Sequence, residues 1–276
     1  MDLRIGSAFP RLLERRYPTI KPSYSLLSVL YLLRMEDVAA VPLSEGLTSR
    51  RAVFGYSSLP KLMNLSPAAF DEFLDGPCER GAEKLDSFGL DDDVEKLLEA
   101  FKKRKLGFSL VNGKVRGEPR TILVSLVDIM GLYKTKQITS DMLVGEVSSP
   151  IFSMAGKSSI REALSAMFRL THRTVFISGQ RKYISDRSII DRVFGPTSLD
   201  LIRDGSKTDV LDAKIGALEK MTPIEVGGRT SLQAAVLRLE DGGPCLAIKK
   251  KEEVVTAWDL VMKPWESGRL TISART

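Results

Sequence analysis

The chain contains one pattern four times, and this repetition limits the folds open to it. Each copy begins with a small polar residue that opens a short amphipathic helical run. Two β-type apolar stretches joined by a turn follow, and a hydroxyl residue then opens a second helix. The first helices begin at Ser25, Asp93, Ser159 and Ser231, and the closing hydroxyl residues are Ser57, Ser125, Ser185 and Thr256. Recurrence at about 60 to 70 residues is typical of an array of one supersecondary unit.

Copy four shows the unit most clearly. Its expected elements are a lead-in strand at 223–226, a helix from Ser231, a strand at 245–248, a turn at 249–252, a strand at 253–255 and a closing helix at 257–262. A unit of this size cannot bury both faces of its short sheet, so two copies must pack together to form a core. The expected fold class is therefore α/β (α+β), with each copy a small sheet and two packed helices.

Loop length divides the four copies into two pairs. Copies one and two are longer because of the connection between their two strands, at 44–51 and 112–120, where glycine and charged residues indicate a solvated hairpin loop. We therefore expect two modules of two consecutive copies, divided near residue 135. The first module is 1–135, with copies at about 9–66 and 80–135, and the second is 136–276, with copies at about 140–196 and 212–268.

The closing hydroxyl residue of each copy belongs to a short motif at the end of the last strand. Copies two and four have two apolar residues, Ser or Thr, two variable residues and then Asp, at 123–128 and 254–259. In copies one and three the acidic position holds Pro60 and Ser188 instead. Two copies thus carry the complete motif and two carry a degraded one.

With these motifs in register, the sequence from about Phe9 to Trp265 resembles the CBS-domain family, in which two copies form a Bateman module. The resemblance implies four tandem CBS repeats paired into two Bateman modules. It also implies that adenine nucleotides bind in the clefts between paired repeats. The implied ligands are AMP, ADP or ATP, with S-adenosylmethionine as a further candidate, and no cofactor is required.

The resemblance also implies the binding residues. The hydroxyl group and first amides of a helix favour an anion, and the Asp carboxylate can accept hydrogen bonds from both ribose hydroxyls. We expect one complete site per module, at Asp128 and Asp259. The nucleotide-binding residues expected are Ser125, Asp128, Thr256, Asp259, Ile224, Val226, Thr19, Ile20, Ser57 and Ser185. The residues expected to contact phosphate are His172, Arg173, Arg104 and Lys105.

Each of these features also has a purely structural interpretation. Ser/Thr-x-x-Asp is a helix capping box that needs no ligand. Arg104 and Lys105 belong to a basic run at 102–105 that closes a helix, where cations are favoured in any case. His172, beside Arg169 and Arg173, equally fits a solvated surface.

Composition and the absence of some motifs exclude several kinds of site and protein class. The single histidine excludes a metal site built on several histidines, and the sequence has no P-loop and no G-x-G-x-x-G motif. No apolar run approaches the ~20 residues that span a bilayer. Two cysteines far apart in sequence fit a reducing compartment. Two asparagines and three glutamines among many charged residues suggest a thermophilic source.

The sequence therefore predicts a cytoplasmic, non-enzymatic sensor that binds an adenine nucleotide and transmits the bound state to a protein effector, as a single chain or a homodimer. The net charge of +6 leaves one alternative open, a nucleic-acid-binding protein that uses basic surface patches. No stacking-aromatic motif or recognition-helix pattern supports that alternative.

Overall fold

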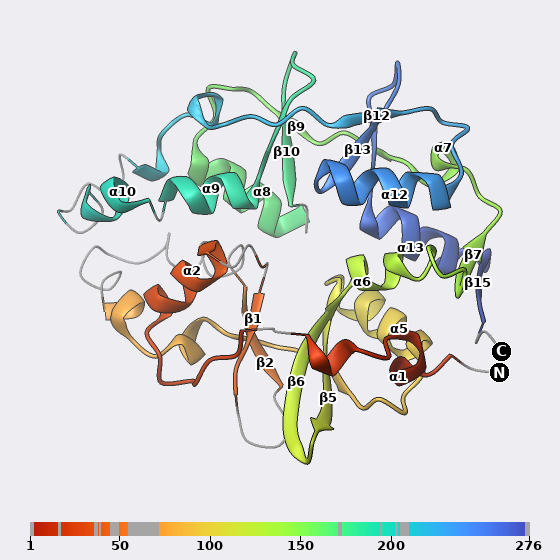
Figure 1. Ribbon diagram of the computed structural model, residues 1–276. Helices are drawn as coiled ribbons and strands as arrows, with labels where there is room; N and C mark the ends of the chain where they lie inside the picture. The colour runs from red at the N-terminus through yellow and green to blue at the C-terminus, as the bar shows by residue number, and fades with distance from the viewer. Residues whose placement is uncertain are drawn as a thin grey trace. The chain divides into compact units, whose positions relative to one another are not determined.

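The computed structural model describes residues 3–15, 18–35, 38, 40–44, 50–54, 72–170, 173–193, 195–201, 204 and 210–273 (Figure 1). By its internal packing the chain divides into two compact units, each with segments from both halves of the sequence. Unit 1 contains Met1–Arg16, Asp86–Ile151 and Pro223–Thr276, and unit 2 contains Tyr17–Leu85 and Phe152–Thr222.

The predicted order of elements is present in copies two, three and four. Copy two has α5 (Val94–Arg104), β5 (Phe108–Val115), β6 (Glu118–Ser125) and α6 (Leu126–Gly131). Copy three has α8 (Ile160–Leu170), β10 (Thr174–Ile177), β11 (Tyr183–Ser185) and α9 (Asp186–Val193). Copy four has α12 (Leu232–Gly242), β13 (Cys245–Ile248), β14 (Glu253–Thr256) and α13 (Ala257–Glu266). In copy one the described residues form α2 (Leu26–Met35), β1 (Ala40–Pro42) and β2 (Arg51–Phe54).

In copies two, three and four a short lead-in strand runs parallel to the first strand, and the second strand pairs antiparallel with the other edge of the first. The lead-in strands of copies two, three and four are β4 (Ser87–Phe88), β9 (Ser153–Met154) and β12 (Ile224–Val226). In copy one a parallel bridge between Ile20 and Leu43 takes this place. Copy two contributes the sheet β4-β5-β6 and copy three the sheet β9-β10-β11.

Shorter elements precede, connect and follow the copies. They are α1 (Ile5–Ala8), η1 (Leu12–Glu14), η2 (Cys78–Gly81), β3 (Glu83–Lys84), β7 (Ile138–Ser140), α7 (Val144–Val147), β8 (Ser149–Pro150), α10 (Pro196–Leu201), η4 (Ile215–Ala217) and β15 (Leu270–Ile272). In unit 1, β8 extends the copy-four sheet by pairing with β14, and β7 pairs with β15. The Tyr133 hydroxyl donates a hydrogen bond of 2.9 Å to the Leu260 carbonyl, which joins the end of copy two to α13.

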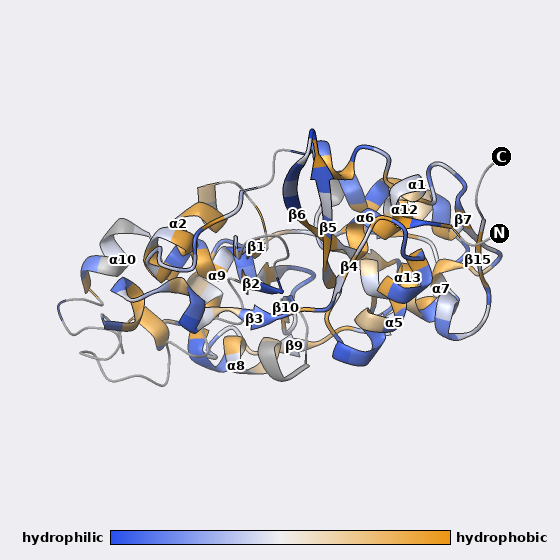
Figure 2. Cartoon of the chain, turned by 90° about the horizontal axis from the view of Figure 1, so that it is seen from below, coloured by the Kyte–Doolittle hydropathy of each residue, from blue (hydrophilic) through white to orange (hydrophobic). Residues whose placement is uncertain are grey.

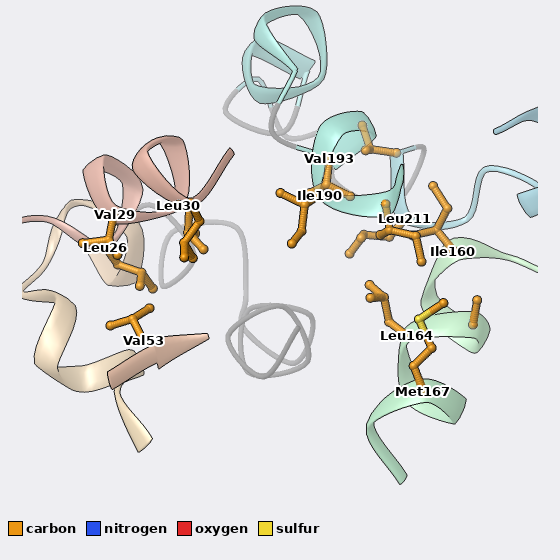
Figure 3. Packing of buried hydrophobic residues seen from close by; sticks show 14 of the residues in the cluster. Leu26, Val29, Leu30, Val53, Ile160, Leu164, Met167, Ile190, Val193 and Leu211 are labelled. Atoms are coloured by element: carbon orange, nitrogen blue, oxygen red, sulfur yellow. The ribbon is translucent and has the colours of Figure 1, made fainter. Parts of the chain in front are cut away.

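The core of unit 2 explains why this unit combines copies one and three. One buried apolar cluster takes side chains from α2, α8 and α9 (Figure 3). The labelled members of these helices are Leu26, Val29, Leu30, Ile160, Leu164, Met167, Ile190 and Val193. The apolar faces of helices in the two copies thus pack against each other. The units differ in composition from the expected modules 1–135 and 136–276, and the pairing of consecutive copies stays a prediction.

The long connection in copy two is not the solvated loop expected at 112–120. The antiparallel ladder of β5 and β6 continues through that stretch to the pair Val115 and Glu118. Arg116 and Gly117 form the turn, with φ of 52° and 86°. Two consecutive positive φ values are typical of a type I′ turn, whose twist suits a two-residue hairpin. The extra residues of copy two therefore lengthen the strands. In copy one, 45–49 lie outside the described residues.

Candidate functional site

The two complete hydroxyl-x-x-Asp motifs fold alike, as capping boxes at the starts of α6 and α13. Ser125 donates hydrogen bonds to Asp128 Oδ2 from its N–H, at 2.8 Å, and from its hydroxyl, at 2.9 Å. Thr256 does the same to Asp259 Oδ2, at 2.9 and 2.8 Å. Each carboxylate therefore uses Oδ2 within its own helix N-terminus. Both motifs lie in unit 1.

The second oxygen of Asp128 meets a cation from a distant part of the chain. The Arg15 guanidinium forms a hydrogen-bonded ion pair with Asp128 Oδ1. The Arg15 side chain is 46% exposed and that of Asp128 is 15% exposed. Because an ion pair that water reaches is weak, this contact can be exchanged for another at low energetic cost.

The second oxygen of Asp259 is enclosed. The Ser149 hydroxyl donates to Asp259 Oδ1 at 2.6 Å, and Lys263 Nζ lies 3.0 Å from the same oxygen. Lys263 Nζ also donates to the carbonyls of Val147 and Ser148, at 2.7 and 2.9 Å. The Asp259 side chain is only 4% exposed. This carboxylate joins α13 to the end of α7 and the start of β8.

The degraded motif of copy three keeps a weaker version of the cap. Ser188 replaces the acid: its N–H donates to Ser185 Oγ at 3.2 Å, and the Ser185 N–H donates to Ser188 Oγ at 3.4 Å. Ser185 is buried. A hydroxyl group at this position carries no negative charge for a ribose diol. Ser57, its counterpart in copy one, lies outside the described residues.

Two of the four residues expected to contact phosphate, Arg104 and Arg173, form ion pairs with acidic residues of their own copies. Arg104 makes two hydrogen bonds with Asp86, of 2.6 and 2.9 Å, and the pKa of its guanidinium is raised by them. Arg173 Nε lies 2.9 Å from Asp186 Oδ2. Lys105 ends α5 in the left-handed conformation and is exposed. His172 lies outside the described residues.

Of the four residues expected to flank the adenine, two are buried and two are not. Ile20 and Val226 are buried, whereas Thr19 is exposed and Ile224 is partly exposed. The Ile20 N–H donates to the Pro42 carbonyl at 3.2 Å, in the position of a lead-in strand. Only Thr19 and Ile224 thus present appreciable side-chain surface.

Three residues in contact with the two carboxylates were not among the expected site residues. Lys263 lies four positions after Asp259, a spacing that brings two side chains together on one helix face, so the sequence contained a signal for it. Arg15 and Ser149 are separated from their partners by 113 and 110 positions, and no local pattern predicts such contacts.

Both cysteines of the chain are buried. Burial raises the pKa of the Cys78 thiol to about 11 and that of Cys245 to about 12, so both are protonated at neutral pH. No group of three or more potential metal-ligating side chains is found among the residues that the structure describes. None of the helices in the described ranges is long and apolar enough to span a bilayer.

Comparison with known proteins gives structural matches alone. No family model matches the chain, and no curated protein matches it. The crystal structure of a Methanocaldococcus jannaschii protein, a proposed archaeal homologue of g-AMPK, superposes with a TM-score of 0.78. The match covers 95% of this chain and 100% of that chain at 12% sequence identity.

Two matches of about half the chain have TM-scores below 0.5 and add nothing to this assignment. CBSX2 in complex with AMP matches with a TM-score of 0.38 and 16% identity, over 49% of this chain and 98% of that one. The CBS domain of a bacterial CNNM/CorC family Mg²⁺ transporter in complex with ATP gives 0.33 and 16%, over 46% and 92%. At the level of fold, the CBS-domain resemblance predicted from the sequence is confirmed.

Proposed function

We propose that this chain is a regulatory protein that binds an adenine nucleotide, with Asp128 of copy two as its principal contact to the ribose. The observation that carries the proposal is the capping box at the end of β6, which holds a carboxylate by one oxygen and leaves it partly exposed. The fold is shared with a proposed homologue of g-AMPK, which makes AMP and ATP the first ligands to test.

The chemistry of the contact follows from the two oxygens of Asp128. Ser125 engages Oδ2 through two hydrogen bonds and so holds the carboxylate in one orientation. Oδ1 has two lone pairs, which suit the adjacent 2′- and 3′-hydroxyls of a ribose. Hydrogen bonds to a charged group contribute ~1.5–3 kcal/mol each. S-adenosylmethionine carries the same adenosine group and belongs to the same class of ligand.

Asp259 is the weaker candidate of the two. A ribose could reach its Oδ1 only after Ser149 and Lys263 had left it, and removing two hydrogen-bonding partners from a buried carboxylate is expensive. We therefore propose that the copy-two site fills first. Transmission of the bound state to a protein effector, and assembly into a homodimer, remain part of the same proposal. The proposal contains no catalytic step.

Isothermal titration of AMP and ATP tests the site. Asp128→Asn removes one negative charge but keeps a side-chain oxygen for Ser125, and it should weaken binding about ten- to a hundredfold, or ~1–3 kcal/mol. Asp141→Asn is the matched control, because Asp141 also pairs with an exposed arginine, Arg269, in unit 1. The control should bind like the wild type. Equal affinity in the wild type and Asp128→Asn, or no binding to the wild type, would refute the proposal.

A second candidate function, nucleic-acid binding, is favoured by the end of the β5–β6 hairpin. Lys114, Arg116 and Arg120 are exposed there, and the outer part of β6 is hydrophilic (Figure 2). A two-stranded ribbon with cations can contact phosphates of a duplex. Binding of a duplex that weakens steeply with added salt, and that is lost in a triple Gln variant of these three residues, would support this function instead.

A further inference from the structure

The residues ahead of the Ile20–Leu43 bridge of copy one dock on copy two. Three backbone hydrogen bonds, of 2.8 to 2.9 Å, join residues 3–6 to residues 90–94. Arg4 adds a contact to Asp93, at 3.4 Å between Nε and Oδ1. These contacts place the start of the N-terminal segment, which we define as 3–15, beside the start of α5.

The element η1 anchors the same segment at a second place, against the β5–β6 hairpin. Leu12 and Leu13 of η1 are buried. A Cβ atom at Gly113 of β5 would lie 2.3 Å from Leu13 Cδ1, so Leu13 packs where the hairpin has no side chain. The hairpin therefore accepts the N-terminal segment because position 113 is glycine.

Arg15 follows this anchor directly and reaches the candidate site. Its guanidinium pairs with Oδ1 of Asp128, the oxygen that the capping box leaves free. A ribose diol needs both lone pairs of that oxygen, since Ser125 already occupies Oδ2. Arg15 and the diol therefore cannot both be fully bound to the carboxylate.

We propose that Arg15 is a built-in competitor of the ribose, and that the N-terminal segment in this way lowers the nucleotide affinity of the copy-two site. This inference rests on the proposed function. The competitor is tethered two residues after a buried anchor, so its effective concentration at Asp128 is high and independent of protein concentration. Because the pair is exposed, it is weak, and a ligand can displace it.

Adenosine is the probe that isolates this competition, because it carries the ribose diol but no charge. Arg15→Gln should bind adenosine about two- to fivefold more tightly than the wild type, the range expected for loss of one exposed ion pair. Arg15→Lys keeps a cation and should stay close to the wild type. Arg11→Gln, which removes an exposed arginine of the same segment, is the matched control and should leave the affinity unchanged.

Salt provides a second readout that a general loss of structure would not reproduce. Added salt screens an exposed ion pair but not the binding of a neutral ligand. The wild type should therefore bind adenosine more tightly as NaCl is raised from about 20 mM to about 500 mM, whereas Arg15→Gln should show a flat response. Circular dichroism of each variant checks that it is folded.

The outcomes separate this inference from the proposed function. Unchanged or weaker adenosine binding by folded Arg15→Gln overturns the competitor role. Weaker AMP binding with unchanged adenosine binding also overturns it, since Arg15 would then contact phosphate. If Asp128→Asn abolishes binding while Arg15→Gln behaves like the wild type, only the competitor role fails. If neither the wild type nor Arg15→Gln binds adenosine or AMP, both proposals fail.

Discussion

Copies two and four carry the same motif and build the same helix cap, but their aspartates have different surroundings. Oδ1 of Asp128 faces an arginine that is nearly half exposed and comes from the N-terminal segment. Oδ1 of Asp259 lies between Ser149 and Lys263, and almost none of its side chain is exposed. The motif thus determines the local cap, whereas the packing of distant segments determines whether the carboxylate is available to a ligand.

The two aspartates also have different roles. Lys263 hydrogen-bonds the carbonyls of Val147 and Ser148 at the end of α7, and Asp259 neutralises its charge. A lysine at the C-terminal end of a helix is favoured by the unpaired carbonyls there. In copy four, Asp259 therefore helps to hold α13 against the end of α7 and the start of β8. In copy two the equivalent residue, Asp128, caps α6 and, among the described residues, pairs only with the exposed Arg15.

The largest expected effect is on stability, in a pair of alanine variants. Asp259→Ala should lower the free energy of unfolding by ~3 kcal/mol, because it leaves Lys263 as a charge without its acidic partner. Asp128→Ala should lower it by only ~1 kcal/mol, the usual loss of a helix cap, since Arg15 can turn to water. Urea unfolding of both variants measures the difference. Equal losses would mean that the two surroundings are energetically alike.

The next effect concerns the order in which the sites fill. Titration of AMP into the wild type should show that one nucleotide per chain binds first. Asp259→Asn should change the affinity of this first site less than about twofold, since Asp259 is not its ligand. This holds because Ser149 and Lys263 must leave Asp259 before a ribose can bind it. Two equal sites per chain, or loss of the first class in Asp259→Asn, would contradict the comparison.

A smaller effect is expected from the second anchor of the N-terminal segment. Gly113→Ala should displace Leu13, whose Cδ1 would lie 2.3 Å from the new Cβ, and so loosen the position of Arg15. Adenosine affinity should rise toward that of Arg15→Gln, with a loss of stability of ~1 kcal/mol from overpacking. Gly227→Ala is the control, since its Cβ would meet nothing closer than 3.7 Å. Unchanged adenosine affinity in folded Gly113→Ala would argue against the anchor.

The smallest effect tests an exposed ion-pair cluster near α7. Hydrogen bonds from Arg269 lower the pKa of Asp141 and Glu146 below their ordinary values of 3.8 and 4.5. A folded-state pKa below the unfolded one means that the stabilisation is present at neutral pH and is lost as the pH falls through the folded pKa. Arg269→Ala should therefore melt slightly below the wild type at pH 7, with a smaller difference near pH 3. An equal difference at both pH values would exclude this origin.

The features that depend on residues close together in the chain could be predicted from the sequence. Ser159 and Ser231 begin first helices as expected: Ser159 forms a capping box with Glu162, with hydrogen bonds of 2.8 and 3.1 Å, and Ser231 caps α12 by accepting from the Ala234 N–H. Strand and helix order follows from such local patterns, because caps, turns and apolar periodicity act within a few residues.

Features that depend on distant contacts were not predictable. Arg15 and Asp128 are 113 positions apart, and nothing within either local pattern requires the other. The ladder of β5 and β6 continues to the pair Val115 and Glu118, where a loop was expected. Charged residues alternate with apolar ones on either side of the two-residue turn that begins at Arg116. The effector, the homodimer, the cytoplasmic location and the thermophilic source stay predictions.

A crystal structure of the full chain with AMP would show which carboxylate holds the ribose. We expect the ribose 2′- and 3′-hydroxyls to lie within hydrogen-bonding distance of Asp128 Oδ1, and the Arg15 guanidinium to have moved away from it. A nucleotide bound elsewhere, with the pair of Arg15 and Asp128 intact, would mean that Asp128 is not the ribose ligand.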